Sequence, residues 1–386
     1  MNSSLRVLMV SDVFFPRING VSTSIETFRA ALSEHGVHVG VVAPRYNGEA
    51  DTDNIIRVPG RRLPRDPEDR LMQYRPLRET VLEAARDYDL IHVQTPFAAH
   101  YAGLHAAKNL GKPVLATYHT LFEEYLQHYI PFLPAASLRA LARRFSRGQC
   151  NALDAVVVPS TAMESRLRAY GVETDMHILP TGLPESAFRP GDRTRFRVRH
   201  GIPQESPVAL FVGRVAHEKN IAFLLDALSQ ARKNMPELLL LITGEGPALA
   251  DLRRQAERLG LVDAVRFLGY LDRRNELPDA YAAADAFVFA SQTETQGLVL
   301  LEAMAQGCPV VAQSVMGTAD ILQAGRGCVV APDDPHEFAR ALLQLLGDSE
   351  LHASLSAQAR QYAREWSDSA LARRMAQLYQ QLTARA

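Results

Sequence analysis

Cysteine, long hydrophobic runs and a charge excess are scarce or absent in this sequence, and each absence excludes a class of protein. The three cysteines, Cys150, Cys308 and Cys328, are widely separated and lack the spacing of metal ligands, so neither a disulfide framework nor a zinc site is expected. Free thiols of this kind fit a reducing compartment, and we predict a cytoplasmic protein. No apolar run approaches the ~18 residues of a membrane-spanning helix, so any membrane contact is expected to be peripheral.

The balance of charge excludes further partners. Lysine and arginine together number 42 against 43 aspartate and glutamate residues, which gives a net charge of -1. Such a chain has no basic field for nucleic acid, and charge alone would not hold it on a membrane. Asp51 and Asp53 lie in a polar turn and are interpreted as solvated, and no other cluster has metal-ligand spacing. We therefore expect no metal cofactor.

Short apolar runs alternate with helical patterns along the chain, which is typical of βαβ units and parallel sheets. The first set of runs spans 5–10, 37–43, 90–93, 113–117 and 155–159, and the second spans 207–213, 238–243, 264–268, 286–290, 310–313 and 328–331. The segment 181–206 between the sets is rich in proline, glycine and charge, the composition of a linker. The pattern predicts an α/β protein with two doubly wound, Rossmann-like domains.

The domain boundaries follow from this alternation. We place the first domain at residues 1–190 and the second at 191–365. Helical patterns continue from Pro335 to the C-terminus, where no strand is left for them to serve. The final segment, 366–386, is expected to form a helix that crosses back and packs on the first domain.

The stretch Ala290–Gly307 carries the clearest signal of a site. It leaves an apolar strand, turns through polar residues and enters a helix with apolar residues at helical spacing. Free amides at the start of that helix suit an anion such as phosphate, and two glutamates can accept hydrogen bonds from sugar and ribose hydroxyls. The candidates are Glu294, Thr295, Gln296, Gly297, Leu298 and Glu302. The alternative is a solvated loop before an ordinary amphipathic helix, because acids favour first turns on electrostatic grounds alone.

The start of the second domain adds cations to this signal. Arg214 and Lys219 follow the strand that ends at Gly213, and fixed cations there can neutralise a diphosphate leaving group. Asn220 can cap the next helix. Gly244–Pro247 is interpreted as a structural turn, with nucleotide contact as the less favoured alternative.

Two loops of the first domain end near the same edge of its predicted sheet. Gly20, in Asn19-Gly20, would let a phosphate approach the backbone beyond the first strand, or it serves only a turn. His119 follows the strand 113–117 together with Tyr118, and a histidine there can bind hydroxyls or carry protons. A satisfied structural histidine is the alternative, and His92 and His128 are weaker candidates.

With these residues in hand, the chain resembles the retaining GT-B glycosyltransferases, a large bacterial family that includes glycogen synthases, mannosyltransferases and glycolipid synthases. The resemblance covers nearly the whole chain. Three motifs carry it: G-R-V-A-H-E-K at Gly213–Lys219, G-E-G-P at Gly244–Pro247, and the glutamates Glu294 and Glu302 with seven residues between them. It implies a GT-B fold, in which two Rossmann-like domains face a cleft.

The resemblance also implies roles for single residues. Arg214 and Lys219 would hold the diphosphate, Glu294 would contact the donor sugar and Glu302 the ribose. His119 would lie beside the transferred sugar, and the loop of Gly20 would close over the phosphates. The expected catalytic residues are His119, Arg214, Lys219 and Glu294, and the expected donor-binding residues are Gly20, Arg214, Lys219, Glu294, Thr295, Gln296, Gly297, Leu298 and Glu302.

Within the family, P-R-I-N-G-V-S-T-S, Y-H-T-L-F-E-E-Y and S-Q-T-E-T-Q-G-L are most similar to enzymes that glucosylate diacylglycerol. Many relatives carry Phe and Pro where this chain has Gln296 and Leu298. They also often have two adjacent glycines where it has Asn19-Gly20, and Asn-Gly-Ile-Asp in place of Thr181–Pro184. These departures favour the glycolipid branch and leave the sugar open.

A glycolipid synthase needs a surface for its lipid. The segment 135–147 predicts an interfacial amphipathic helix, with Leu138, Leu141 and Phe145 on one face and arginines mainly elsewhere, although a domain-covering helix has a similar pattern. The residues expected at the membrane or acceptor are Tyr118, Phe122, Arg139, Arg143, Arg144 and Arg147.

Together these expectations describe a retaining hexosyltransferase on the inner face of the cell membrane. We expect UDP-glucose as donor, a lipid such as diacylglycerol as acceptor, and same-face transfer in which the leaving diphosphate takes the acceptor proton. Transfer of mannose or another hexose in lipopolysaccharide or exopolysaccharide synthesis is the first alternative. Two alternatives from other functional classes are a UDP-sugar 2-epimerase and a non-catalytic nucleotide-sugar sensor.

Overall fold

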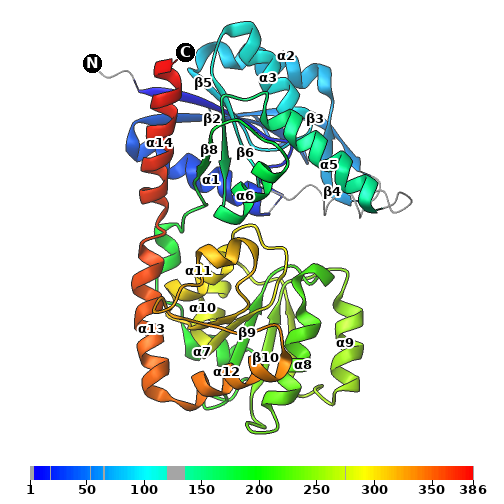
Figure 1. Cartoon of the computed structure of the whole chain (residues 1–386), viewed down its shortest axis with the longest axis vertical. Helices are drawn as coiled ribbons and strands as arrows, with labels where there is room; N and C mark the ends of the chain where they lie inside the picture. Colours follow the sequence, from blue (N-terminus) through cyan, green and yellow to red (C-terminus); the bar gives the residue numbers. More distant parts are fainter. Residues whose placement is uncertain are drawn as a thin grey trace. The chain divides into compact units, whose positions relative to one another are not determined.

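The computed structural model describes residues 4–17, 19–52, 54–63, 66–119, 135–273 and 275–385. It divides into two compact units (Figure 1): unit 1 is Met1–Gly182 with Asp368–Ala386, and unit 2 is Leu183–Ser367. Unit 1 ends before the expected boundary near residue 190 because Leu183 already pairs with Ser367, and its amide donates to the carbonyl of Trp366 at 2.8 Å.

Unit 1 contains an eight-stranded sheet with the order β4-β3-β2-β1-β5-β6-β7-β8. The strands are β1 (Leu5–Val10), β2 (Val37–Arg45), β3 (Ile55–Leu63), β4 (Asp66–Met72), β5 (Leu90–Val93), β6 (Val114–Thr117), β7 (Ala155–Val158) and β8 (Met176–Ile178). β3 and β4 pair antiparallel, whereas the other described pairs of this sheet are parallel. β3, β4 and β8 were not predicted, since arginine, proline and acids interrupt the apolar residues of β3 and β4, and β8 has only three residues.

Helices cover this sheet, and the last one comes from the C-terminus. They are α1 (Gly20–Leu32), η1 (Ser33–His35), α2 (Tyr74–Ala84), η2 (Ala85–Asp87), α3 (Ala98–Leu110), α5 (Ala135–Cys150), α6 (Thr161–Ala169) and α14 (Asp368–Arg385). α14 packs on α1 and buries Leu371, Met375, Leu378, Tyr379 and Leu382 in the core of unit 1. At roughly 1.5–3 kcal/mol for each large buried side chain, this stripe attaches the crossing helix firmly.

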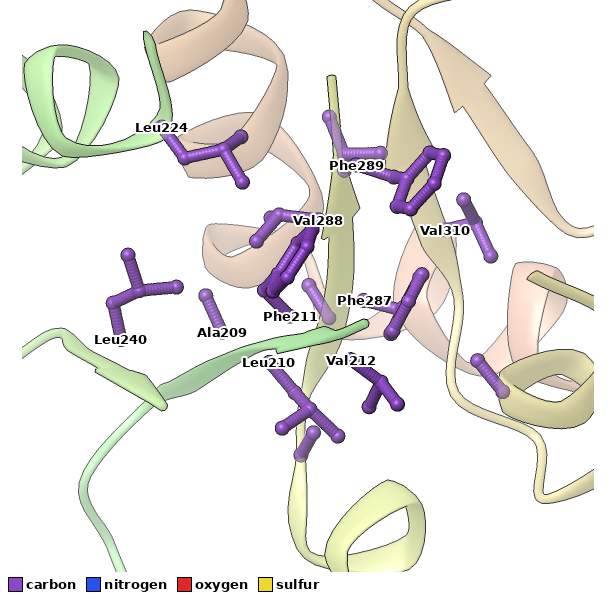
Figure 2. Close-up of a cluster of buried hydrophobic side chains, with 14 of the residues drawn as sticks. Ala209, Leu210, Phe211, Val212, Leu224, Leu240, Phe287, Val288, Phe289 and Val310 are labelled. Atoms are coloured by element: carbon purple, nitrogen blue, oxygen red, sulfur yellow. The ribbon is translucent and has the colours of Figure 1, made fainter. Parts of the chain in front are cut away.

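Unit 2 contains a six-stranded parallel sheet with the order β11-β10-β9-β12-β13-β14. Its strands are β9 (Val208–Val212), β10 (Leu239–Thr243), β11 (Val265–Gly269), β12 (Ala286–Phe289), β13 (Val310–Ala312) and β14 (Cys328–Val330). The strands are nearly continuous apolar runs because helices cover both faces. Figure 2 shows aromatic side chains of β9 and β12 in this core, where the rings of Phe211 and Phe289 stack with centroids 5.9 Å apart.

The segment predicted as a linker, 181–206, is largely folded into unit 2. Arg197 is fully buried; its guanidinium donates to the carbonyls of Ala283 and Ser206 and pairs with Asp285 at 3.0 Å. A buried charge is tolerated only with such partners. The helices of unit 2 are η3 (Glu185–Phe188), α7 (Arg193–Arg199), η4 (His217–Lys219), α8 (Ile221–Ala231), α9 (Leu249–Arg258), α10 (Glu276–Ala283), α11 (Leu298–Ala305), η5 (Met316–Asp320), α12 (Pro335–Gly347) and α13 (Ser349–Arg364).

The cysteines, the possibility of a membrane-spanning helix and possible metal ligands were considered from composition. The three cysteines are free and buried, and burial raises the pKa of Cys150 to about 12 and that of Cys328 to about 11. Among the residues with described positions, no helix has the length and apolarity needed to cross a membrane, and no group of histidine, cysteine or acidic side chains is arranged to hold a metal ion.

Candidate active site

The strand order of unit 2 places one loop at the centre of the carboxyl edge of its sheet. β9 and β12 are neighbours there, with β10 and β11 on one side and β13 and β14 on the other. Ligands of open α/β sheets bind beyond such a switch point. The loop between β12 and α11 starts at this point, and its Gly297 has a φ of 91°, a left-handed conformation that favours glycine.

An ion pair joins two loops at the switch point. Lys219 Nζ lies 2.7 Å from Glu294 Oε2, and the two side chains are 20% and 21% exposed. Lys219 ends η4 after β9, whereas Glu294 follows β12. Ser291 adds a second link, since its hydroxyl donates to the carbonyl of Glu218 at 3.4 Å. Two residues predicted for the donor therefore meet because their strands are neighbours.

Two further candidates on the loop after β9, Arg214 and Asn220, are not held by such contacts. Arg214 is exposed, and no salt bridge to it occurs in the described parts of the chain. Asn220 stands at the N-cap of α8, but its side chain makes no capping hydrogen bond. Its φ of 52° is left-handed, while a capping side chain normally needs an extended residue. The predicted cap is therefore wrong.

Glu302, on α11, is fixed by two residues that the sequence analysis missed. Tyr281 donates its hydroxyl proton to Glu302 Oε2 at 2.8 Å, and Arg273 pairs with Oε1. Burial, and then the charge of Glu302, raises the pKa of Tyr281. Tyr281 is on α10, which contacts α11, and Arg273 precedes α10. Neither has a recognisable sequence signal, because only the packing of α10 on α11 brings them to Glu302.

The loop before α11 is supported by backbone contacts with η5. Thr295 and Gln296 each make an interaction within the protein, and Leu298 begins the helix. The carbonyl of Glu294 accepts a hydrogen bond from the amide of Gly317 at 2.9 Å. A β-carbon on Gly317 would lie 2.0 Å from the carbonyl oxygen of Thr295. This close approach of the two backbone segments therefore requires glycine at position 317.

A chain of side-chain hydrogen bonds crosses the same edge. Gln313, buried after β13, accepts a hydrogen bond from Gln292 and donates one to Asp333 at 2.8 Å. Thr318 then ties η5 to this segment, because its hydroxyl contacts the carbonyls of Gln313 and Val315 at 3.2 and 2.8 Å. These hydrogen bonds were not predicted, although Gln292 and Asp333 follow the predicted strands 286–290 and 328–331 and Gln313 ends the predicted strand 310–313.

The Gly244–Pro247 loop is a structural element of this edge. Gly244 has a φ of 117°, and a β-carbon there would lie 2.0 Å from the carbonyl oxygen of Gly213. The amide of Val215 donates to the carbonyl of Glu245 at 2.9 Å. These contacts hold the loop after β10 against the loop that carries Arg214 and Lys219, which agrees with the structural interpretation of the motif.

The carboxyl edge of the unit 1 sheet holds the other candidates. His119 Nε2 lies 3.0 Å from Gln94 Oε1. One step deeper, His92 bonds the hydroxyls of Thr117 and Tyr379 at 2.8 and 2.7 Å. His92 lies in β5 and Gln94 follows it, while Thr117 lies in β6 and His119 follows it. Two side-chain hydrogen bonds therefore join these neighbouring strands. His92 is thus a structural histidine that ties α14 to the sheet.

Burial changes the protonation of these histidines. It lowers the pKa of His119 to about 4 and that of His92 to about 3, with a smaller contribution from the nearby His119 to the latter. Both are therefore neutral at pH 7. A neutral imidazole can donate or accept a hydrogen bond, so His119 is suited to contact hydroxyl groups.

The first loop of unit 1 leaves room beside its backbone. Gly20 begins α1, and a β-carbon there would meet no atom within 4 Å. Asn19 caps the helix, since its Oδ1 accepts a hydrogen bond from the amide of Ser22 at 2.9 Å. The sequence analysis missed the acid at the end of β1: Asp12 accepts hydrogen bonds from Thr95 and from an amide at the start of α3, and burial raises its pKa to about 6.

Some of the residues predicted to bind lipid lie in the described part of the structure. Tyr118 bonds Ser146 of α5 through its hydroxyl at 2.9 Å. Arg143 lies over the ring of Tyr170, Arg147 lies 4.0 Å from Glu173, and Arg144 is exposed. Leu141 is 54% exposed and stands among these arginines. Phe122 and His128 lie outside the described residues, as do Asp53 and the side chain of Arg139.

The buried histidines and Asp12 predict a pH dependence of folding. Burial lowers the pKa of His92 to about 3 and those of His100 and His119 to about 4. The free energy of unfolding therefore falls as the pH drops below ~6.5, where the unfolded chain takes up protons first. Asp12 opposes these histidines between about 6 and 4, because its raised pKa lets the folded state take the proton first. We expect a net loss of about 4 kcal/mol in the free energy of unfolding from pH 7 to 5. Urea denaturation at both pH values measures it, and an unchanged value would contradict the assignment.

Comparison with known proteins gives the fold and the site a family. The Glycosyltransferase Family 4 model matches residues 18–186, and the Glycosyl transferases group 1 model matches residues 192–362. The alpha-monoglucosyldiacylglycerol synthase of Streptococcus pneumoniae is 34% identical over 319 residues, which cover 80% of this chain and 71% of that protein. The GDP-mannose-dependent alpha-mannosyltransferase of Mycobacterium tuberculosis is 29% identical over 376 residues, which cover 94% of this chain and 93% of that one.

Solved structures support the same fold. The crystal structure of Anabaena Alr3699/HepE in complex with UDP is similar to this chain with a TM-score of 0.77 and 20% sequence identity, and the match covers 98% of this chain and 100% of that one. Both family models and the relatives name glycosyl transfer. The chain therefore belongs to the group 1 glycosyl transferases, and it is a hexosyltransferase with the GT-B fold of two Rossmann-like units.

Proposed function

We propose that this enzyme transfers glucose from UDP-glucose to a lipid acceptor, diacylglycerol, and keeps the α configuration of the sugar. The observation that supports the donor site is the ion pair between Lys219 and Glu294 at the switch point of unit 2. Glu302, on α11, follows Glu294 in the sequence. A cation for the diphosphate and two carboxylates for hydroxyl groups are what a nucleotide sugar requires. The S. pneumoniae relative that is named for glucosyldiacylglycerol synthesis supports the choice of sugar and acceptor.

Each residue of the site has a chemical task in this proposal. Lys219 and Arg214 neutralise the charge that develops on the diphosphate as the bond to the sugar breaks. Glu294 accepts hydrogen bonds from sugar hydroxyls, and Glu302, held by Tyr281, accepts them from the ribose. His119 contacts the transferred sugar in its neutral form, and the open backbone at Gly20 leaves room for phosphate.

The transfer step balances without a protein nucleophile. The bond between the anomeric carbon and the diphosphate oxygen breaks, and the acceptor oxygen bonds to the same face of that carbon. The acceptor proton passes to the leaving diphosphate, which becomes free UDP. In this proposal Arg214 and Lys219 supply the positive charge, so we expect turnover without an added divalent metal.

The direct test is incubation with UDP-glucose and liposomes of diacylglycerol and anionic lipid, followed by mass spectrometry. We expect α-linked hexosyl-diacylglycerol, with the configuration read from the anomeric NMR coupling. A product with a β linkage would refute retention, and UDP release without any glycolipid would move the acceptor to a saccharide or another lipid. Turnover of UDP-glucose to a different UDP-sugar without acceptor would favour an epimerase instead.

Mannosyl transfer is the second candidate, because the M. tuberculosis relative is named for a GDP-mannose-dependent reaction and matches 94% of this chain. The same assay with GDP-mannose distinguishes the two. A kcat/KM for GDP-mannose above that for UDP-glucose would replace glucose by mannose in the proposal. Binding of either donor with no turnover would instead indicate a sensor.

We also propose that α5 docks on anionic lipid. Its exposed surface combines Leu141 with Arg143, Arg144 and Arg147, and basic residues near a membrane contribute about 1 kcal/mol each. We expect the variant with Arg139, Arg143, Arg144 and Arg147 changed to Gln to bind anionic liposomes at least about tenfold more weakly in sedimentation assays. A control that removes the same charge elsewhere, at Arg254, Arg258, Arg340 and Arg373, should bind as the wild type does. Equal binding of all three proteins would rule out this surface.

A further inference from the structure

Unit 2 has a pocket of about 450 Å³ that none of the assigned residues uses. The ends of α10 and α11 line it at Ala282, Ala305 and Gln306, together with residues after η3 and the last turns of α13. In a βαβ unit each helix runs opposite to its strands, so helix ends lie at the amino edge of the sheet. The pocket therefore lies away from Glu294, which precedes the start of α11.

The charge of the pocket has one sign. Three arginines line it, Arg193, Arg360 and Arg364, and none of the lining residues is an acid. Arg193 is already paired, since its guanidinium lies 2.8 Å from Asp285. Arg360 and Arg364 have exposed side chains and no salt bridge within the described chain. Two guanidinium groups therefore have donors to spare.

A purely structural explanation covers only part of this arrangement. Arginines near helix ends often bind the last carbonyls, and Arg193 does so with the carbonyl of Ala283 at 3.2 Å. Arg360 reaches the carbonyl of Gln306 only at 3.4 Å, and Arg364 lies over the ring of Phe188. Like charges four residues apart on a helix repel each other by a few tenths of a kcal/mol, and an anion between Arg360 and Arg364 would offset that repulsion.

We propose that this pocket binds a phosphomonoester of a small polyol or sugar as a regulatory ligand. Guanidinium groups bind phosphate oxygens in pairs, and Phe188, Pro190 and Ala282 offer an apolar wall to the carbon skeleton. The volume lies within the usual range of ~300–1,000 Å³ for small-molecule sites. The phosphate group is the required chemistry, whether a free metabolite or a lipid headgroup carries it.

The position of the pocket gives the ligand a route to the donor site, a part of the proposal that rests on the proposed function. α11 begins beside Glu294 and Gly297 and ends at the pocket, a distance of about 12 Å along its eight residues. The same pocket touches α13 just before Trp366, whose carbonyl binds Leu183 where the chain passes between the units. A bound anion would fix the end of α13 to the segment after η3 and shift turnover.

Binding can be measured without turnover because the chain has one tryptophan, Trp366. It follows Arg364 by two positions and packs edge-on against Tyr362 at 6.0 Å, so its fluorescence reports on this pocket. The titration uses glucose 6-phosphate, glycerol 3-phosphate and inorganic phosphate in turn, with saturating UDP present to occupy the donor site. We expect a saturable fluorescence change with at least one phosphomonoester at concentrations up to about 10 mM.

The decisive variant changes Arg360 and Arg364 to Gln, and the matched control changes Arg254 and Arg258 of α9 to Gln. We expect the affinity to fall at least about tenfold in the first variant and to stay unchanged in the control, with similar melting temperatures for all three proteins. Equal affinity in the Arg360/Arg364 variant and the wild type would overturn the proposal, because the anion would then bind elsewhere.

Vesicles containing phosphatidic acid separate the two sources of phosphate. If soluble phosphomonoesters leave the fluorescence unchanged but these vesicles alter it, and the Arg360/Arg364 variant loses that response, the pocket takes a lipid headgroup. No response to any of these probes would reject the site. The fluorescence assay does not require glycosyl transfer. A failed glucosylation assay would therefore not affect the conclusion on this pocket. In the transfer assay, the bound phosphomonoester should change the rate at least twofold in the wild type and not in the variant.

Discussion

Replacing Lys219 with alanine is expected to lower kcat about 10²–10³-fold, the loss that follows removal of one preorganised donor to a developing oxyanion. Lys219 Nζ is fixed 2.7 Å from Glu294 at the point where the strand order of unit 2 reverses. The variant loses the cation that neutralises the leaving diphosphate, and it also frees Glu294 to move. Steady-state rates of UDP release with donor and acceptor measure the effect.

The stability of this variant should change much less than its activity. Both side chains of the pair are partly exposed, and such pairs contribute on the order of 1 kcal/mol or less. Lys233 provides a matched control in the same unit, since its Nζ donates a hydrogen bond to Gln230 on the surface, and Lys233→Ala should keep wild-type turnover. Unchanged turnover in Lys219→Ala would refute its assignment to the diphosphate, and a melting temperature that falls with activity would indicate a structural role.

Replacing Gly317 with alanine is expected to lower kcat/KM about 10²-fold, a loss of the size caused by misplacing a reacting group by about 1 Å. The added β-carbon would lie 2.0 Å from the carbonyl oxygen and 2.2 Å from the carbonyl carbon of Thr295. Backbone atoms cannot rotate away as a flexible side chain can, so the loop that carries Glu294 must shift. The expected signature is a loss in kcat/KM together with weaker UDP binding by calorimetry.

Gly347 serves as the control for this substitution. It ends α12, and a β-carbon there would meet no atom within 4 Å, so Gly347→Ala should leave donor binding and turnover unchanged. Wild-type kinetics in Gly317→Ala would show that η5 does not support the donor loop. If the variant fails to fold, circular dichroism will reveal it, and Thr318→Val then tests the same support by removing the hydroxyl that ties η5 to Gln313.

The residues around the candidate donor site differ in how far the sequence alone pointed to them. Glu294 and Lys219 were predicted from residue type and position, because each follows an apolar run that forms a strand. Arg273, Tyr281 and Gln313 were missed, since a surface arginine, a helical tyrosine and a strand-end glutamine have many ordinary roles. Their contacts depend on which helices and strands are neighbours, and that order is not written in any local pattern.

The fold shows the same division. Continuous apolar runs such as Val208–Val212 predicted the buried strands, because a strand covered on both faces must be apolar along its whole length. β3, with the sequence I-I-R-V-P-G-R-R-L, contains too many polar residues for that rule, and it forms because β2 offers an edge for it. The predicted linker contained α7, whose burial depends on an ion pair between Arg197 and Asp285 that lie far apart in the chain.

The sequence by itself determined the two sets of alternating strands and helices, the loop chemistry at their ends and the family to which the motifs point. These properties are local, because periodicity, capping and glycine spacing act within one or two turns. The tertiary structure alone decided that Lys219 meets Glu294, that Tyr281 holds Glu302, that Tyr379 of α14 bonds His92, and that two arginines of α13 share a pocket with the end of α11. Each of these contacts joins segments distant in sequence, and only the order of the strands and the packing of helices on them brings such segments within reach.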